Sequence, residues 1–366
     1  CRRPGISRKT GYKWIERFKT EGFSGLADHS RAPLRRPGAV SDELLDPVLE
    51  IKRDHPSWGP RKILGYMANS EPNRELPSHA TVSRRFRDLG LSTNRKRRHP
   101  PRGYCSPYGD YHGPNAAWSV DYKGPLTLLC GRRECHPLTL ADVTSRFLLR
   151  CDSMGQIHGR KAKKTFESAF IEYGLPEVIR SDNGPPFSSP AVGGLSKLSI
   201  WWIKLGITPH RSPPATPTQQ ARHERMHRTL NEESERGRTL REQQKHFDSF
   251  RKMFNTERPH EALNNKVPAD VYTPSPRRYP TKLQDPVYEH EFFVERVGTG
   301  GKLRFAGCSG VTSTLLSGEL VGLRRHDQKI WEVTFGSVHP GLLNPRGFHP
   351  GRRHQSRAKE NVLPMS

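Results

Sequence analysis

The sequence has little that a membrane or secreted protein requires. No apolar run approaches the ~18–20 residues of a membrane-spanning helix, and no stretch resembles a secretory signal peptide. Hydrophobic residues make up only 33% of the 366 positions, which is low for one large core. We therefore expect several small domains, about two to four for this length, in a cytoplasmic protein with no membrane partner.

Cysteine is also scarce, and its spacing argues against the common zinc motifs. No two cysteines form a Cys-x-x-Cys pair. Cys130 and Cys135 flank a short Gly-Arg-Arg-Glu stretch, but no second Cys or His pair follows at the spacing of a zinc site. We expect free thiols of a reducing compartment at all six cysteines, which occupy positions 1, 105, 130, 135, 151 and 308.

Acidic residues are few relative to basic ones. Lys and Arg number 61 and Asp and Glu 37, so the formal net charge is +24. A charge this large favours a polyanionic partner, most often nucleic acid. The alternative is a basic protein of the ribosomal type, or one whose charge only keeps it soluble.

Residues 7–22 are predicted to form a basic amphipathic helix. Ser7 is suited to the N-cap and Gly22 to the C-terminal stop, and Trp14 and Phe18 lie on one apolar stripe. The candidate DNA contacts around that stripe are Arg8, Lys9, Lys13 and Arg17. A short basic helix of this kind is typical of the recognition helix of a helix-turn-helix. The alternative is a basic surface helix with no partner.

A second helical unit is predicted over residues 37–93. Its last expected helix, which begins at Ser78, carries two further candidate DNA contacts, Arg84 and Arg85. The proline-rich linker that follows adds the candidate phosphate contacts Arg95, Lys96 and Arg97. Two helical units in tandem favour DNA as the partner more than either does alone.

The pattern changes near residue 116. Three antiparallel strands are expected first, and then strands that alternate with helices, which predicts a mixed α/β domain. Short, regularly spaced strands near the C-terminus predict a small β-barrel. The predicted divisions are helix-turn-helix units at 1–36 and 37–93, a linker at 94–115, the α/β domain at 116–274, a linker at 275–287, the barrel at 288–345 and a disordered basic tail at 346–366.

Three carboxylates stand out in the α/β domain. Asp121 lies inside an expected strand, on the face opposite to Trp118, where a charge is costly unless it is paired or bound to a metal. Asp182 ends another strand, and Glu224 lies on a helix. Together they can hold two Mg²⁺ ions, which activate a water or hydroxyl for phosphoryl transfer. The alternative is that Asp182 only shapes its turn and that Glu224 only pairs with Arg228.

The segments around these acids carry a family resemblance. WSVDYKG, RSDNGPPF and RHERMHRTLNEE resemble, in this order, the three acidic motifs of DDE insertion-sequence transposases, the group with a retroviral-integrase-type core. The stretch FNTERPHEALNNKVPADVY resembles the segment that closes such catalytic domains. The resemblance implies a ribonuclease-H-like fold, preceded by the helix-turn-helix units and followed by an SH3-like barrel.

The same resemblance implies an activity. Asp121, Asp182 and Glu224 would be ligands of Mg²⁺, for which Mn²⁺ substitutes. The reaction would be cleavage of the element ends and their transfer into double-stranded target DNA, by a homo-multimer in the bacterial nucleoid. Arg225 and Arg228 are candidate contacts to the DNA backbone. The two histidines beside Glu224, His223 and His227, are expected to lie on the surface, with or without a contact to phosphate, rather than to bind zinc.

A departure from the family pattern keeps a second function open. Gln219-Gln220-Ala221 stands where relatives usually carry a glycine-containing turn before the third acid. A decayed copy would be a catalytically inactive DNA-binding remnant or repressor. Asp142, in the next expected strand, is the rival to Asp121 as the first acid. A ribonuclease of the same fold is a third alternative, which would not need tandem helix-turn-helix units.

Overall fold

The computed structural model describes residues 5–28, 40–92, 111–131, 133–211 and 221–351. The chain divides into two compact units, residues 1–46 and 47–366. Helix α2 (Asp42–Asp54) crosses the boundary between them. No helix among the described residues is long and apolar enough to cross a membrane.

The first unit contains the helix α1 (Arg8–Glu21) and a short 3₁₀ turn, Gly22–Leu26. The Ser7 hydroxyl accepts a hydrogen bond from the Thr10 backbone N–H at 3.1 Å, which caps the first turn. The helix ends at Gly22, whose φ of 64° suits a residue without a Cβ. The sequence prediction of a helix over these residues is therefore confirmed.

Two further helices, α3 (Pro60–Ser70) and α4 (His79–Asp88), lie in the second unit. Pro60 opens α3, and the Ser78 hydroxyl caps α4 by accepting from the Thr81 backbone N–H at 3.2 Å. The side chains buried around these helices are Trp58, Ile63, Met67, Val82 and Phe86. The helical unit predicted here thus has its own apolar contacts.

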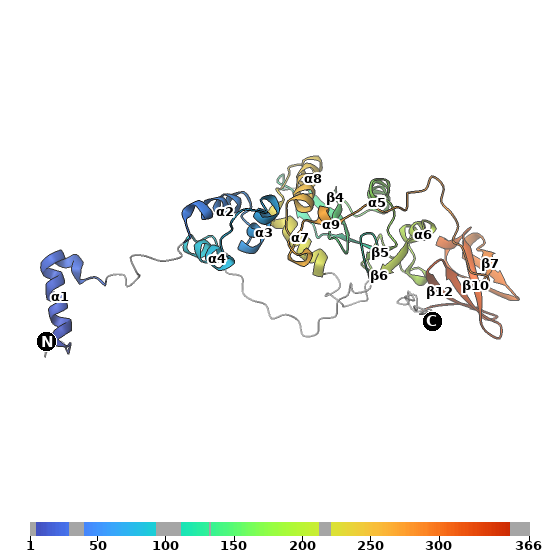
Figure 1. Cartoon of the computed structure of the whole chain (residues 1–366). Coiled ribbons are helices and arrows are strands. Elements are labelled where there is room, and N and C mark those ends of the chain that lie inside the picture. Colours follow the sequence, from blue (N-terminus) through green and yellow to red (C-terminus); the bar gives the residue numbers. More distant parts are fainter. Residues whose placement is uncertain (1–4, 29–39, 93–110, 132, 212–220, 352–366) are drawn as a thin grey trace, which may run out of the picture. The chain divides into compact units, whose positions relative to one another are not determined.

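A six-stranded mixed sheet forms the centre of the second unit (Figure 1). Its strands are β1 (Ala117–Tyr122), β2 (Leu126–Thr127), β3 (Glu134–Asp142), β4 (Leu148–Met154), β5 (Val178–Ser181) and β6 (Thr208–Arg211). The order is β2-β3-β1-β5-β6, with β4 paired to β3. Strands β1 to β4 pair antiparallel, whereas β1, β5 and β6 pair parallel. This confirms the predicted mixed α/β domain.

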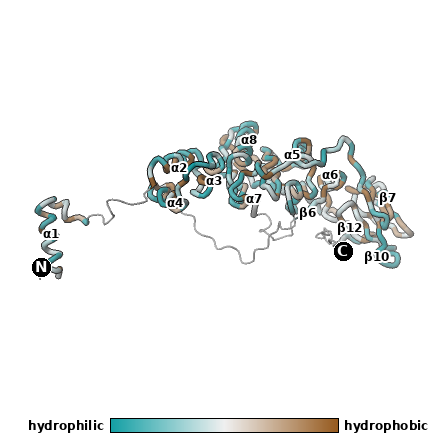
Figure 2. Tube along the Cα trace, in the orientation of Figure 1, coloured by the Kyte–Doolittle hydropathy of each residue, from teal (hydrophilic) through white to brown (hydrophobic). Residues whose placement is uncertain are grey.

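Helices cover both faces of this sheet. They are α5 (Gly159–Tyr173), α6 (Lys197–Lys204), α7 (Ala221–Glu233) and α8 (Leu240–Thr256), and the short α9 (Pro268–Val271) follows. On one face, Trp118 of β1 packs among aromatic residues of α5 and α6, including Phe170 and Trp202. On the other face, Met226 of α7 and Phe250 of α8 pack on strand residues of β3 and β4. Figure 2 shows hydrophilic and hydrophobic residues alternating along α5 and α8, as expected for helices with one buried face.

The C-terminal region is all-β, as predicted. Its strands are β7 (Phe293–Arg296), β8 (Lys302–Phe305), β9 (Cys308–Val311), β10 (Leu320–Asp327), β11 (Ile330–Phe335), β12 (Val338–Asn344) and β13 (Gly347–Pro350). Five of them form a sheet in the order β13-β12-β11-β10-β7, and β8 and β9 form a separate hairpin. The hairpin lies against both ends of the sheet, since β8 approaches β7 and β9 approaches β12 and β13. No strand pairing among the described residues closes a barrel, so the SH3-like barrel stays a prediction.

The last strand differs from the sequence analysis. β13 lies within residues 346–366, where we expected a disordered tail. The strand is short and polar, but it pairs with β12 in antiparallel register, Leu342 opposite His349 and Leu343 opposite Phe348. An edge strand of this kind is held by its neighbour and has no alternating apolar pattern of its own. Residues 352–366 lie outside the described part of the chain.

Candidate active site

Asp121 and Asp182 lie on neighbouring parallel strands. The register of β1 and β5 places Ser119 opposite Arg180. The same register, extended by two residues along both strands, places Asp121 beside Asp182, which directly follows the last residue of β5. The sequence separates these carboxylates by 61 positions, and strand pairing brings them together.

Both carboxyl groups have raised pKa values. Burial is the main cause at Asp121, and the negative charges of Asp182 and Glu224 add to it, so that its pKa rises to about 7. The backbone N–H of Tyr122 opposes this shift by hydrogen bonding. Burial also raises the pKa of Asp182, against a backbone hydrogen bond from Gly184. The site therefore concentrates negative charge that a cation would neutralise.

The turn after β5 fixes the Asp182 carboxylate. A Cβ added to Gly184 would lie 2.9 Å from Oδ2 of Asp182, which is closer than real Cβ atoms come. Oδ1 of Asp182 is buried and has no hydrogen-bond partner within the described residues. A buried carboxylate oxygen without a donor is unusual, and it fits a position where a hard cation binds.

Glu224 stands apart from the two aspartates. It lies in the first turn of α7 and is exposed. Its charge nevertheless contributes to the raised pKa of Asp121. In the described part of the chain no three His, Cys, Asp or Glu side chains are grouped as ligands of one ion. The two aspartates thus fit Mg²⁺ ligation by their oxygen donors, whereas Glu224 is in electrostatic range without completing the group.

A threonine holds the backbone of Asp121, and a histidine lies beside its side chain. Thr139, opposite Asp121 on β3, donates its hydroxyl to the Asp121 carbonyl at 3.1 Å. Its Oγ1 also lies 2.8 Å from Nε2 of His227. Since the hydroxyl proton is used, the network assigns the second bond to an Nε2–H donor on His227. Nδ1 of that ring then faces Oδ2 of Asp121, at 3.9 Å.

The surface location expected for the two histidines is wrong. His223 and His227 are 6% and 9% exposed, and their rings stack at 5.5 Å. Burial, then the charges of His223 and Lys123, lower the pKa of His227 to about 3, so the ring is neutral. The signal was present in the sequence. Positions 223, 226, 227 and 230 follow the i, i+3, i+4, i+7 spacing of a buried helix face.

The rival acid Asp142 has a structural environment. It is 2% exposed and accepts hydrogen bonds from the Asn115 N–H at 2.7 Å and from the Ser145 N–H and hydroxyl at 2.7 and 2.6 Å. These three donors use its oxygens and fasten the turn after β3. This arrangement supports Asp121 rather than Asp142 as the first acid of the site.

The candidate DNA contacts fall in different places. Arg225 and Arg228 are exposed on α7, close to Glu224. Arg84 is exposed on α4 and Arg85 is partly buried there. In the first unit, Arg8, Lys9 and Lys13 are exposed, and Lys13 and Arg17 lie 5.3 and 5.2 Å from the Trp14 ring. The cations of the linker, Arg95, Lys96 and Arg97, and the departure at Gln219–Gln220 lie outside the described residues.

Comparison with known proteins agrees with this geometry. Residues 10–86 match a homeodomain-like domain model, and residues 205–268 match an integrase core domain model, which includes Glu224. A protein of insertion element IS407 from Burkholderia multivorans is 24% identical over 242 residues, 64% of this chain and 82% of the relative. A protein of insertion element IS476 from Xanthomonas euvesicatoria is 26% identical over 256 residues, 67% of this chain and 69% of the relative.

The chain is thus similar to insertion-element proteins, and it matches an integrase core domain over part of its length. The resemblance drawn from the three acidic motifs is thereby confirmed. The integrase core also relates the chain to the Gag-Pol polyprotein of baboon endogenous virus, 30% identical over 119 residues, which are 32% of this chain and 6% of the polyprotein. The magnesium-bound catalytic core of HTLV-2 integrase overlays with a TM-score of 0.33 at 14% identity, over 44% of this chain and 99% of that one.

Proposed function

We propose that the chain cleaves the ends of its mobile element and joins them to target DNA. The observation that carries this proposal is the pairing of Asp121 and Asp182 at adjacent strand ends, where each carboxyl is buried and Oδ1 of Asp182 lacks a donor. Such a pair is costly in the free protein and is stabilised once a divalent cation neutralises it.

The residues of this chain have distinct roles in that reaction. Asp121 and Asp182 would hold Mg²⁺ or Mn²⁺, with Glu224 joining from α7 once DNA is bound. The bound metal supplies activation of the attacking hydroxyl group and stabilisation of the leaving oxygen. Thr139 holds the backbone of Asp121, and His227 bonds to Thr139 and packs beside the carboxylate. Arg225 and Arg228, on the exposed side of α7, would contact the phosphates on either side of the reacting bond.

The remaining parts of the chain would select and hold the DNA. The N-terminal helical units would read the element ends by base-edge contacts, and the basic residues of α1, α4 and the linker would supply phosphate contacts. We propose the domain divisions given above, an SH3-like C-terminal domain, and a homo-multimer assembled on double-stranded DNA in the cytoplasm. The formal charge of +24 supports a salt-sensitive DNA complex.

A second function is favoured by the position of Glu224. Its carboxylate is exposed and forms no three-ligand group with Asp121 and Asp182 among the described residues. If DNA does not draw it toward them, the chain would be a DNA-binding remnant that occupies element ends without cleaving them.

One experiment separates the two functions. Supercoiled plasmid that carries the element's own ends is incubated with the wild type or with Asp182→Asn, in Mg²⁺ or Mn²⁺. If the chain is a transposase, the wild type nicks the plasmid only when metal is present. Asp182→Asn should then bind the plasmid as well as the wild type does but should not nick it. Nicking that persists in Asp182→Asn would contradict the assigned role, and binding without nicking by either protein would identify the remnant.

A further inference from the structure

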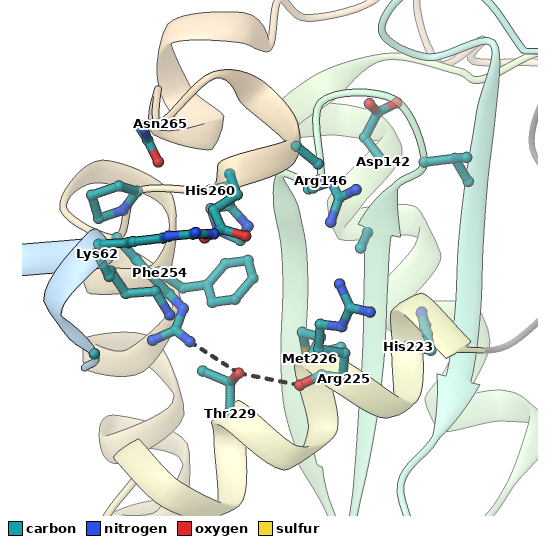
Figure 3. Close-up of a pocket in the computed structure, with 18 of the residues that line it drawn as sticks. Lys62, Asp142, Arg146, His223, Arg225, Met226, Thr229, Phe254, His260 and Asn265 are labelled. Atoms are coloured by element: carbon teal, nitrogen blue, oxygen red, sulfur yellow. Dashed lines mark hydrogen bonds and ion pairs between the residues drawn. The ribbon is translucent and has the colours of Figure 1, made fainter. Parts of the chain in front are cut away.

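A pocket lies beside the carboxylates in the second unit. It has a volume of about 720 Å³ and is formed where α3 meets α7, α8 and the turn between β3 and β4. Figure 3 shows Lys62, Phe254 and His260 on one side of this pocket and Arg146, Arg225 and Met226 on the other. Its size falls within the ~300–1000 Å³ typical of small-molecule sites and far exceeds what one phosphate needs.

Helix α3 is seated tightly against the core at this place. Gly65 of α3 leaves only 3.2 Å between an added Cβ and the Cβ of Asn265, and Asn69 donates to the Asn265 carbonyl at 2.8 Å. Ser57 also donates to the Glu233 carboxylate. The pocket wall contributed by α3 is therefore fixed by specific contacts.

The pocket is strongly cationic. Its charged lining residues are the basic Arg61, Lys62, Arg146, Arg225 and Arg258 and the acidic Asp142 and Glu261. Both acids are already engaged, since Glu261 pairs with Arg61 at 3.4 Å and Asp142 accepts the three hydrogen bonds described above. Arg258 pairs with Glu233.

Two of these cations have no hydrogen-bond or ion-pair partner among the described residues. Within the described part of the chain, the side chains of Lys62 and Arg225 make no hydrogen bond or ion pair. Burial, and then the charge of Arg258, lower the pKa of Lys62 to about 8, although the charges of Glu233, Glu261 and Glu232 oppose this shift. The N-terminus of α3, where Pro60 opens the helix, adds its partial positive charge on the same wall. An anion would relieve this repulsion.

The remaining lining combines polar side chains, including Ser119, Thr229 and Asn265, with an apolar set. The apolar lining residues include Phe254, Met226, Pro259, Ala141 and Val143. Met226 and Phe254 belong to one buried cluster, against which Ala141 packs. Planar bases pack on aromatic rings and on arginine planes, and this packing is worth ~1–3 kcal/mol per base. A cationic rim over an apolar floor matches a ligand that is charged at one end and flat and apolar at the other.

We propose that this pocket binds a single nucleotide whose base is not stacked in a duplex. Its phosphate lies toward Lys62 and Arg225, and its base lies against Phe254 and Met226. The pocket adjoins the acids: Ser119 lines it two residues before Asp121, and Arg225 directly follows Glu224. The ligand can be a nucleotide of the DNA strand held at those acids or a free nucleotide, because both have the same chemistry. The first case rests on the proposed function.

Binding of dAMP and of inorganic phosphate to the full-length chain, without divalent metal, tests the proposal by calorimetric titration. We expect dAMP to bind about 10-fold or more tightly than phosphate, because only dAMP gains the base contact. Lys62→Met and Arg225→Met should each weaken dAMP binding about 10-fold or more. The matched control is Lys164→Met, which removes the same charge from the exposed surface of α5 and should change the affinity less than about 2-fold.

Two results would overturn the inference. One is equal affinity for dAMP and phosphate, and the other is equal weakening by Lys62→Met and Lys164→Met, which would indicate attraction by net charge alone. Phe254→Leu tests the base contact, and thermal melting verifies that this core variant folds. Competition by a duplex with one unpaired adenosine, stronger than by the fully paired duplex, assigns the DNA strand as the source; its absence assigns a free nucleotide.

These readouts are independent of cleavage. A chain that nicks plasmid but does not bind dAMP overturns the pocket and leaves the proposed function. A chain that binds dAMP with the expected variant pattern but does not nick plasmid supports the pocket and overturns the proposed function.

Discussion

The two faces of the central sheet use alternate residues of the same strands. Toward α5 and α6, Trp118, Leu138 and Leu140 meet aromatic rings, with Phe166 and Trp202 at a centroid distance of 5.0 Å. Toward α7, the intervening positions are Asp121 and Thr139, which both lie next to the buried His227.

The comparison shows that one face of the sheet stabilises the fold, whereas the other contains groups that destabilise it. The aromatic face removes large apolar side chains from water, so it is a source of folding free energy. The opposite face holds carboxyl groups whose burial and mutual repulsion oppose folding in the absence of a cation. Because the pleat separates the two sets, a substitution on one face is expected to change stability and one on the other activity.

The largest expected effect is on cleavage. Asp121→Asn should reduce metal-dependent nicking by more than ~100-fold, since a neutral amide is a poor Mg²⁺ ligand. Asp152→Asn is the matched control, because Asp152 lies on β4 and bonds to Thr165 of α5 at 2.6 Å, on the aromatic side. Nicking rates from plasmid gels measure both variants. Equal losses in the two would contradict the division of labour between the faces.

A loss of folding stability should mark the aromatic face. Phe170 is fully buried between Trp118 and Trp201, so Phe170→Ala should lower the free energy of unfolding by ~3–5 kcal/mol. Thr139→Val on the opposite face should cost less, ~1–3 kcal/mol, through two lost hydrogen bonds. Urea denaturation measures both, and a larger loss in Thr139→Val would reverse the comparison.

His227 is expected to affect cleavage indirectly, through the position of Asp121. His227→Ala is expected to lower the nicking rate by ~10–100-fold and to raise the Mg²⁺ concentration required, because Asp121 loses its neighbour. His227→Gln should recover part of the rate, since its amide N–H can reach Thr139. A role in folding alone predicts unchanged metal dependence once melting shows the variants folded, so a metal titration distinguishes the two.

The smallest expected effect is a pH-dependent gain in the thermal stability of Asp121→Asn relative to wild type. The pKa of Asp121 is about 7 in the folded chain against 3.8 unfolded, so the folded state keeps a proton that the unfolded state loses between these values. Stability therefore falls as pH rises from 3.8 to 7, and Asp121→Asn lacks this loss. Without metal, the variant should melt several degrees higher than wild type at pH 8 and equally at pH 4. Mg²⁺ should narrow the gap, and a gap independent of pH would refute the explanation.

Much of this arrangement follows from local sequence. The caps at Ser7 and Ser78 and the alternation around Asp121 are readable because they depend on neighbours within a few residues. The contact of His227 with Thr139 is different, because 88 positions separate the two residues and only strand and helix packing join them. The pocket beside α3 likewise depends on the close approach of Gly65 to Asn265, a contact that the hydrophobic periodicity of the sequence does not indicate.

Gly184 is a position at which one substitution would displace a residue of the proposed metal site. Since an added methyl at Gly184 would collide with a carboxylate oxygen and with no backbone atom, the chain would fold around it and displace only Asp182. A one-residue change could thus silence a copy while its product remained intact and bound to the same ends. On the proposed function, such a copy would compete with intact copies for the same DNA ends, so one substitution at Gly184 would turn the protein into an inhibitor of its own element.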